Sequence, residues 1–240
     1  MRIDNSRVEQ SARPSLFICS PSYTGDFSCH FVTSMLQTCD LLKKEGIPYN
    51  IYFSVFDSLV ARSRNDLVHH FLKSDCTHIL MIDSDQGWEA KAVLEMLRLD
   101  KDFITGAVPA RKHGFEEYAI KIATNADRTP RVNNEGLIYC DSNGVAFGMI
   151  KRKVFEEIKA QNLYNSEVYP YFQHVYYKDG GHYGEDTFFV KSWRDIGEVW
   201  IYPNITFNHG GVIGNYHEFL LKQPQPAGKE MQLLEPEFSI

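Results

Sequence analysis

Up to residue 110, the chain alternates short apolar runs with stretches in which apolar residues recur at helical spacing. The apolar runs lie at residues 15–20, 49–55, 78–82 and 103–108. Between them, apolar side chains return every three or four positions, as they do on the buried face of an amphipathic helix. This alternation predicts a β-α-β-α-β-α-β order, in which crossover helices join the strands of a parallel sheet.

Each predicted helix is marked by its own apolar stripe. The three stripes are Phe31, Met35, Cys39 and Leu42, then Leu67, Val68, Phe71 and Leu72, then Val93, Leu94 and Leu97. Gly46 follows the first stripe and is predicted to cap the C-terminus of that helix. The fold class we expect is therefore α/β.

The run His-Ile-Leu-Met-Ile at residues 78–82 is apolar without alternation, which favours a central strand covered on both faces. Ligands of open α/β sheets bind outside the carboxyl ends of the strands. This strand delivers Asp83, Ser84 and Asp85 to that edge. We therefore expect the functional site there.

After residue 110 the pattern loosens, and no internal repeat is present. We expect short antiparallel strands, a helix near residues 151–161, an irregular Tyr- and Gly-rich segment at 164–183, and a helix near 186–196. The predicted organisation is a flexible N-terminus at 1–14, one domain at 15–220 and a peripheral tail at 221–240.

Composition excludes several classes of protein. At 240 residues one α/β domain can bury a core without disulfides, and the five cysteines form no CxxC pair. The first fourteen residues are polar, and no apolar run approaches the length of a bilayer span. A soluble, cytoplasmic protein without a membrane partner is expected. The net charge of −6 gives no overall attraction for nucleic acid.

Asp83 and Asp85, one residue apart after a buried strand, can direct oxygen ligands at one Mg²⁺ or Mn²⁺. Such a cation would neutralise charge on a diphosphate leaving group. The competing interpretation is that Asp85 caps the next helix. Neither an EF-hand nor a phosphatase of the haloacid type fits, because Gly87 falls at the wrong place for either motif.

Five segments of the sequence carry a family resemblance. They are DSLVARSRN (57–65), THILMIDSDQGW (77–88), DFITGAVPARK (102–112), NGVAFGMIKRKVFEEI (143–158) and GEDTFFVKSWRDIGEVWIYPNITFNHGG (184–211). In this order they resemble GT-A glycosyltransferases of tailed bacteriophages and large viruses, distant relatives of family 2. The resemblance implies a GT-A-like single domain with a mostly parallel central sheet flanked by helices. It also implies a nucleotide-binding half at 15–112 and an acceptor-side half at 113–220.

The resemblance also implies roles for individual residues. Asp83 and Asp85 would form the DxD motif, and His209 would complete the metal shell; an imidazole is a good ligand for Mn²⁺ and a poor one for Ca²⁺, which tilts the choice towards manganese, with Mg²⁺ left open. Arg64 and Asn65 would face the nucleotide, and Lys112 would lie near the donor. These residues come from segments far apart in the sequence.

Asp186, the second member of the Glu185-Asp186 pair, would be the general base that takes the proton of the acceptor hydroxyl. Inversion at the anomeric carbon is the expected outcome, with retention left open. The competing interpretation is that both acids only favour the N-terminus of the helix that they open.

Position along the chain suggests further ligand contacts. Pro21, Ser22 and Tyr23 follow the first strand and are expected to line the base and ribose, with Asp57 opposite them. Ser84 is a further candidate for binding the nucleotide sugar. The aromatic segment at 164–183 is a candidate acceptor platform, or else a loop buried by its own aromatic rings.

The predicted function is that of an enzyme, a metal-dependent glycosyltransferase that moves a sugar from a nucleotide diphosphate sugar, with a uridine nucleotide expected. The alternatives are a non-catalytic carbohydrate-binding or virion-associated module of the same fold, and a nucleotidyltransferase or hydrolase that uses the same metal. The acceptor (glycan, protein, lipid-linked sugar or modified DNA base) and the oligomeric state stay open. If the chain is viral, as the resemblance suggests, the expected location is the host cytoplasm.

Overall fold

The computed structural model describes residues 13–111, 116–161, 168–176 and 180–223. The strands are β1 (Leu16–Ser22), β2 (Tyr49–Val55), β3 (His78–Ile82), β4 (Gln86–Trp88), β5 (Phe103–Gly106), β6 (Lys121–Ile122), β7 (Ile138–Ser142), β8 (Phe147–Lys151), β9 (Val175–Tyr176), β10 (His182–Tyr183), β11 (Trp200–Tyr202), β12 (Thr206–His209) and β13 (Val212–Asn215). The helices are α1 (Cys29–Lys44), α2 (Val60–Lys73), α3 (Ala90–Leu99), α4 (Arg152–Ala160), α5 (Glu185–Arg194) and α6 (Tyr216–Lys222).

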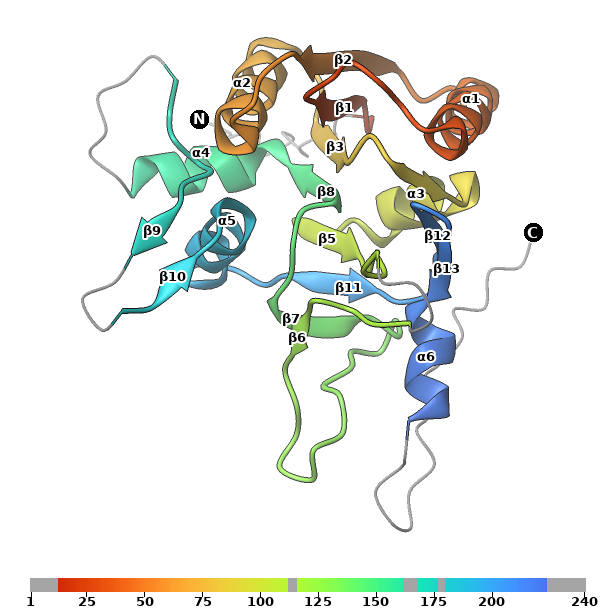
Figure 1. Ribbon diagram of the computed structural model, residues 1–240, viewed down its shortest axis with the longest axis vertical. Coiled ribbons are helices and arrows are strands. Elements are labelled where there is room, and N and C mark those ends of the chain that lie inside the picture. Colours follow the sequence, from red (N-terminus) through yellow and green to blue (C-terminus); the bar gives the residue numbers. More distant parts are fainter. Residues whose placement is uncertain (1–12, 112–115, 162–167, 177–179, 224–240) are drawn as a thin grey trace, which may run out of the picture.

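One large sheet organises the molecule (Figure 1), with eight strands in the order β2-β1-β3-β8-β5-β11-β7-β6. The pairs β1/β2, β1/β3 and β5/β11 are parallel, while β8 is antiparallel to both of its neighbours, β3 and β5. At the far edge, β7 is antiparallel to both β11 and β6. Only β7 and β8 therefore oppose the common strand direction. The predicted α/β class, with a mostly parallel central sheet flanked by helices, is confirmed.

Side chains alternate between two cores, one on each face of the sheet. On β1, Phe17 and Cys19 point into a cluster that contains residues of α2, α4 and α5. Leu16 and Ile18 point the other way, into a cluster with residues of α1 and α3. Every residue of β3 is buried, as its unbroken apolar sequence predicts. The edge of the sheet at which β3 delivers Asp83 and Asp85 is therefore held by a strand packed on both faces.

Local sequence explains where the helices begin and end. The hydroxyl of Ser28 accepts a hydrogen bond from the backbone N–H of Phe31 and so caps the N-terminus of α1. Gly46 follows the C-terminus of α1 with a φ of 67°, which confirms the predicted cap. The helices expected near residues 151–161 and 186–196 are α4 and α5.

The structure corrects several expected boundaries. The first strand continues to Ser22, and the fourth apolar run leaves the sheet after Gly106. Strand β4 was not predicted, because three residues are too few to show a periodic pattern; it forms by pairing with β12. The two expected halves, 15–112 and 113–220, share one sheet, since β8 lies between β3 and β5.

Two global findings complete the fold. All five cysteines are free thiols. Among the described residues, no helix combines the length and the apolar character that crossing a membrane requires.

Candidate active site

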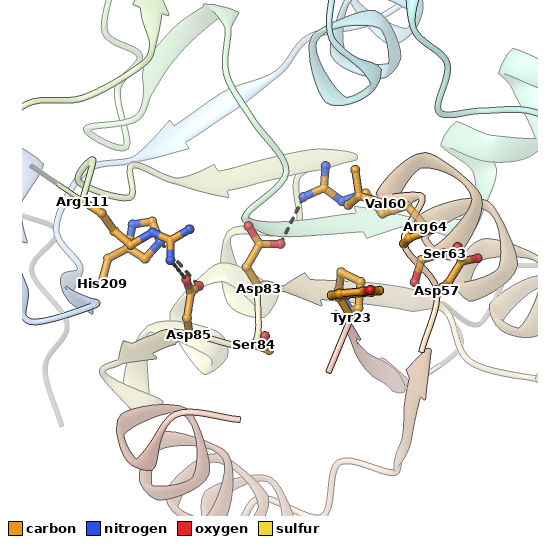
Figure 2. A pocket seen from close by; sticks show the side chains of 12 residues that line it. Tyr23, Asp57, Val60, Ser63, Arg64, Asp83, Ser84, Asp85, Arg111 and His209 are labelled. Carbon is orange, nitrogen blue, oxygen red and sulfur yellow. Dashed lines mark hydrogen bonds and ion pairs between the residues drawn. The ribbon is translucent and has the colours of Figure 1, made fainter. Parts of the chain in front are cut away.

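A cavity of about 290 Å³ opens at the carboxyl ends of β1, β2 and β3 (Figure 2). Its lining residues come from the loops after these strands, from the start of α2 and from two later segments: Pro21, Tyr23, Asp57, Ser58, Val60, Ser63, Arg64, Asp83, Ser84, Asp85, Arg111 and His209. Eight of them were predicted as site residues from the sequence: Pro21, Tyr23, Asp57, Arg64, Asp83, Ser84, Asp85 and His209. We call this space the donor-side cavity.

Asp85 and His209 meet because their two strands pair. Strand β12 lies antiparallel to β4, with His209 opposite Gln86, so the imidazole lies beside the residue that precedes β4. The distance from His209 Nε2 to Asp85 Oδ1 is 3.4 Å. The expectation that Asp85 caps the following helix is not met, because α3 begins at Ala90, after β4.

Hydrogen bonds shift the pKa of Asp85 and the pKa of His209. The bond from His209 lowers the pKa of Asp85, and Arg111 adds to this effect, while burial opposes it. Burial alone lowers the pKa of His209, but its hydrogen bonds to Asp85 and to the carbonyl of Pro109 outweigh burial, so the net pKa is raised. The Nδ1 to Pro109 oxygen distance is 2.7 Å. Nδ1 is therefore the donor to the backbone, and Nε2 faces Asp85.

The chemistry of these two side chains fits a divalent cation. A metal-ligating histidine ordinarily donates its second ring nitrogen to a carbonyl or carboxylate, as Nδ1 of His209 does here. Mg²⁺ and Mn²⁺ sites commonly use one or two protein carboxylates and complete their coordination with substrate phosphates and water. Among the described residues, no three His, Cys, Asp or Glu side chains gather in a metal-binding arrangement. The protein therefore presents a two-residue set.

Asp83 belongs to a separate network. Its Oδ1 accepts a hydrogen bond of 3.0 Å from Nη2 of Arg64 (Figure 2), whereas Asp85 faces His209 and Arg111. Nη1 of Arg64 binds Oε1 of Glu185 at 2.5 Å, and the guanidinium lies 5.9 Å from the ring centroid of Phe172. Arg64 is buried. Two carboxylates, those of Asp83 and Glu185, thus neutralise the charge of Arg64. The hydrogen bond from Arg64 in turn fixes the orientation of Asp83.

Two predicted contact residues, Ser22 and Asn65, do not line the cavity. The hydroxyl of Ser22 is buried and donates to the carbonyl of Asp26 at 2.8 Å. The side-chain amide of Asn65 forms two hydrogen bonds with the backbone of Phe172, each 2.9 Å long. Lys112 lies outside the described residues. Ser22 and Asn65 therefore support the walls of the site.

Four lining residues were not predicted from the sequence: Ser58, Val60, Ser63 and Arg111. Arg111 matters most, because its Nη1 lies 2.7 Å from Oδ2 of Asp85. Its place directly after the fourth apolar run was the signal that could have identified it. Arg62 is not among the lining residues, but it forms two hydrogen bonds with Asp57, which is one of them.

A second cavity of about 380 Å³ adjoins the first and shares His209 with it. We call it the acceptor-side cavity; its other lining residues are Gly106, Val108, Pro109, Ala110, Ala119, Asn143, Gly144, Ala146, Asp186 and Thr187. Oδ1 of Asp186 accepts a 2.7 Å hydrogen bond from the backbone N–H of Thr187. Oδ2 lies where a Cβ on Gly144 would approach within 2.8 Å. Gly144 therefore leaves room for this carboxylate oxygen.

The aromatic segment divides into two parts. Tyr169, Tyr171 and Phe172 are buried in the core, as expected of a loop buried by its own rings. Tyr176 is 78% exposed, and its ring stacks on that of His182 at 4.5 Å. Residues 162–167 and 177–179 of this segment lie outside the described part of the chain.

No family model and no curated protein matches the chain. Among solved structures, a glycosyltransferase involved in the glycosylation of the major capsid of PBCV-1 is similar at 10% identity and a TM-score of 0.33, over 61% of this chain and 64% of that one. S. aureus TarS 1-349 is similar at 12% identity and a TM-score of 0.43, over 78% of this chain and 57% of that one. The same protein in complex with UDP has a TM-score of 0.39, with the same identity and coverage. This chain thus spans less than two thirds of the length of each of these chains.

Proposed function

We propose that the chain is a metal-dependent glycosyltransferase that transfers a sugar from a nucleotide diphosphate sugar, a uridine nucleotide by preference, to a hydroxyl acceptor. One observation carries the proposal: His209 lies between two adjoining cavities, with Asp85 on one side and Asp186 lining the other. Transfer requires two substrates to meet at one carbon atom. Two polar cavities with a shared wall supply that geometry.

The donor-side cavity suits a nucleotide diphosphate. Tyr23, an exposed ring, and Pro21 offer apolar surfaces to a base. The carboxylates of Asp57 and Asp83 are acceptors for base or ribose donors, and Arg64 holds Asp83 in its orientation. In this proposal Arg64 positions Asp83, and does not grip the phosphates itself.

Asp85 and His209 would hold the cation, Mn²⁺ or Mg²⁺, together with the donor phosphates. The cation would supply charge neutralisation for the nucleoside diphosphate leaving group. The Pro109 carbonyl keeps the imidazole in the tautomer whose Nε2 faces Asp85. The imidazole also adds preference for manganese over calcium.

Asp186 is the proposed general base. Its Oδ1 is occupied by the Thr187 N–H, while Oδ2, beside Gly144, is open to a hydroxyl in the acceptor-side cavity. The acceptor oxygen would lose its proton to Asp186 as it bonds to the anomeric carbon, and the bond from that carbon to the phosphate oxygen would break. Attack from the face opposite the leaving group gives inversion.

A panel of nucleotide sugars with and without Mn²⁺ tests the proposal, with the released nucleotide identified by chromatography. We expect a nucleoside diphosphate to appear only when a divalent cation and the preferred donor are present. A nucleoside monophosphate as first product would instead indicate a nucleotidyltransferase or a pyrophosphate hydrolase. Metal-dependent donor binding with no product across a broad acceptor panel would indicate a non-catalytic module.

A further inference from the structure

A diphosphate carries several negative charges, but few cationic groups in the donor-side cavity are available to it. Of the arginine and lysine residues among its described lining, Arg64 is buried and already bound to Asp83 and Glu185. Arg111 is the other, and its side chain is 63% exposed. Arg111 is therefore the lining cation that can exchange its partner without exposing a buried charge.

The stem of Arg111 passes close to the backbone of Gly210. Gly210, directly after β12, has a φ of 60°, and a Cβ there would lie 2.9 Å from Cδ of Arg111 and 3.3 Å from Cγ. The absence of that Cβ lets the stem pass closely over the backbone. The guanidinium then lies beside the ring of His209, and both groups face Asp85 (Figure 2).

Asp85 consequently has both carboxylate oxygens engaged. Oδ1 faces Nε2 of His209 at 3.4 Å, and Oδ2 lies 2.7 Å from Nη1 of Arg111. A divalent cation held by Asp85 and His209 must compete with the guanidinium for this carboxylate. If the cation displaces the guanidinium of Arg111 from Asp85, the guanidinium stays at the same end of the cavity, where the diphosphate would lie.

We propose that Arg111 is a catalytic residue with two successive partners. Before substrates bind, it pairs with Asp85; when the cation and the donor bind, it moves to the diphosphate. There its N–H groups bind nonbridging phosphate oxygens, in the forked geometry that arginine offers to phosphate, as the bond to the sugar breaks. The inference rests on the proposed function, because it requires the cation and the diphosphate donor.

The test compares Arg111→Ala and Arg111→Lys with the unchanged protein. Mn²⁺ affinity is measured without donor, from the electron paramagnetic resonance signal of free Mn²⁺. Removing a half-exposed ion pair from Asp85 should tighten Mn²⁺ binding about two- to fivefold in Arg111→Ala. The same variant should lose about ten- to a hundredfold in kcat/KM for the donor, as expected for a lost charge-assisted hydrogen bond. Arg111→Lys should recover part of the rate, because it retains the charge without the fork.

Arg98→Ala is the matched control, since Arg98 is an exposed arginine on α3 that pairs with Glu45. It should change neither quantity. If Arg111→Ala binds Mn²⁺ no more tightly than the unchanged protein, or keeps its kcat/KM, the inference is wrong while the proposed function stands. If the unchanged protein binds no Mn²⁺, the metal-dependent part of the proposed function fails, and this inference fails with it.

Discussion

His209 commits its two ring nitrogens to different partners, and this division is what makes it a candidate ligand. Nδ1 is tied to the Pro109 carbonyl, so the ring cannot rotate or change tautomer without losing that bond. Nε2 is left facing Asp85. At the scale of single residues, the site thus depends on backbone groups that orient side chains. Gly144 acts in the same way on Asp186, by leaving space beside it.

Replacing Asp85 with alanine should abolish cation-dependent transfer while leaving the fold intact. The carboxylate is partly exposed, and its ion-pair partners, His209 and Arg111, belong to the same cavity, so the loss should fall on catalysis. We expect kcat/KM to fall by at least about a hundredfold, because a cation contributes several kcal/mol of charge stabilisation. Released nucleoside diphosphate is the measurement. Asp40→Ala, which removes an exposed carboxylate on α1 paired with Lys44, is the control. Unchanged transfer in Asp85→Ala would refute the assigned cation site.

Two substitutions at the acceptor-side cavity should act on the same step. Asp186→Asn removes the base and should lower kcat by about 10²- to 10⁴-fold. Gly144→Ala should also lower kcat, because the added Cβ would lie 2.8 Å from Oδ2 of Asp186 and displace it. Gly148→Ala is the matched control, since its Cβ would meet neighbours only at 3.5 Å or more. Equal rates in Gly144→Ala and Gly148→Ala would contradict the assigned position of the base.

At the scale of elements, pairing between strands brings distant segments to the site. The ladder between β4 and β12 places His209 beside Asp85. Gly87 in β4 lets α1 approach, since a Cβ there would lie 2.8 Å from Cβ of His30.

Arg152, at the start of α4, connects α4 with α2. Its guanidinium donates to carbonyls at the end of α2 and beyond it, and lies 4.7 Å from the ring centroid of Phe71.

Arg152→Lys should destabilise the fold although it conserves the charge. The carbonyls of Phe71, Leu72, Ser74 and Cys76 accept its N–H groups, and a lysine cannot reach them all in one planar fork. We expect the free energy of unfolding in urea to fall by about 2 kcal/mol or more. The neighbouring Lys153→Ala, which removes an exposed ion pair with Asp102, should cost about 1 kcal/mol or less. Equal effects of the two changes would show that the fork contributes nothing.

At the scale of the whole molecule, the central sheet contains a buried histidine. His78 begins β3 and is 6% exposed, and its Nε2 has no hydrogen-bond partner among the described residues. Burial lowers the pKa of His78 to about 4, with Lys151 contributing in the same direction and Asp100 and Asp102 opposing it. The native protein therefore keeps this ring neutral at a pH where the unfolded chain binds a proton.

The free energy of unfolding should therefore fall as the pH is lowered from about 6.5 towards 4. Above that range, His78 should not reduce it. The shift corresponds to a loss of roughly 3 kcal/mol across the window. Urea unfolding of the unchanged protein and of His78→Gln at several pH values measures the difference. His78→Gln cannot take up a proton there, so its stability should depend less on pH between these values. Parallel pH dependence in the two proteins would contradict the assignment.

The sequence alone determined the α/β class, the central position of β3 and most of the residues that line the donor-side cavity. Apolar periodicity reports which faces are buried, and the carboxyl ends of parallel strands lie at one edge whatever the strand order. Asp83 and Asp85, and the positions of Tyr23 and Asp57, followed from that rule.

Only the tertiary structure decided which of these residues are free to act. Three contacts join segments distant in sequence: the pairing of β4 with β12, the burial of Arg64 between two carboxylates, and the contact of Arg111 with Asp85. No local pattern encodes such contacts, because each depends on the register of a strand pair or on the space that a glycine leaves. Those same contacts pair Asp83 with a buried arginine and Asp85 with an exposed one, so Asp85 is the carboxylate that a cation would reach at the lower cost.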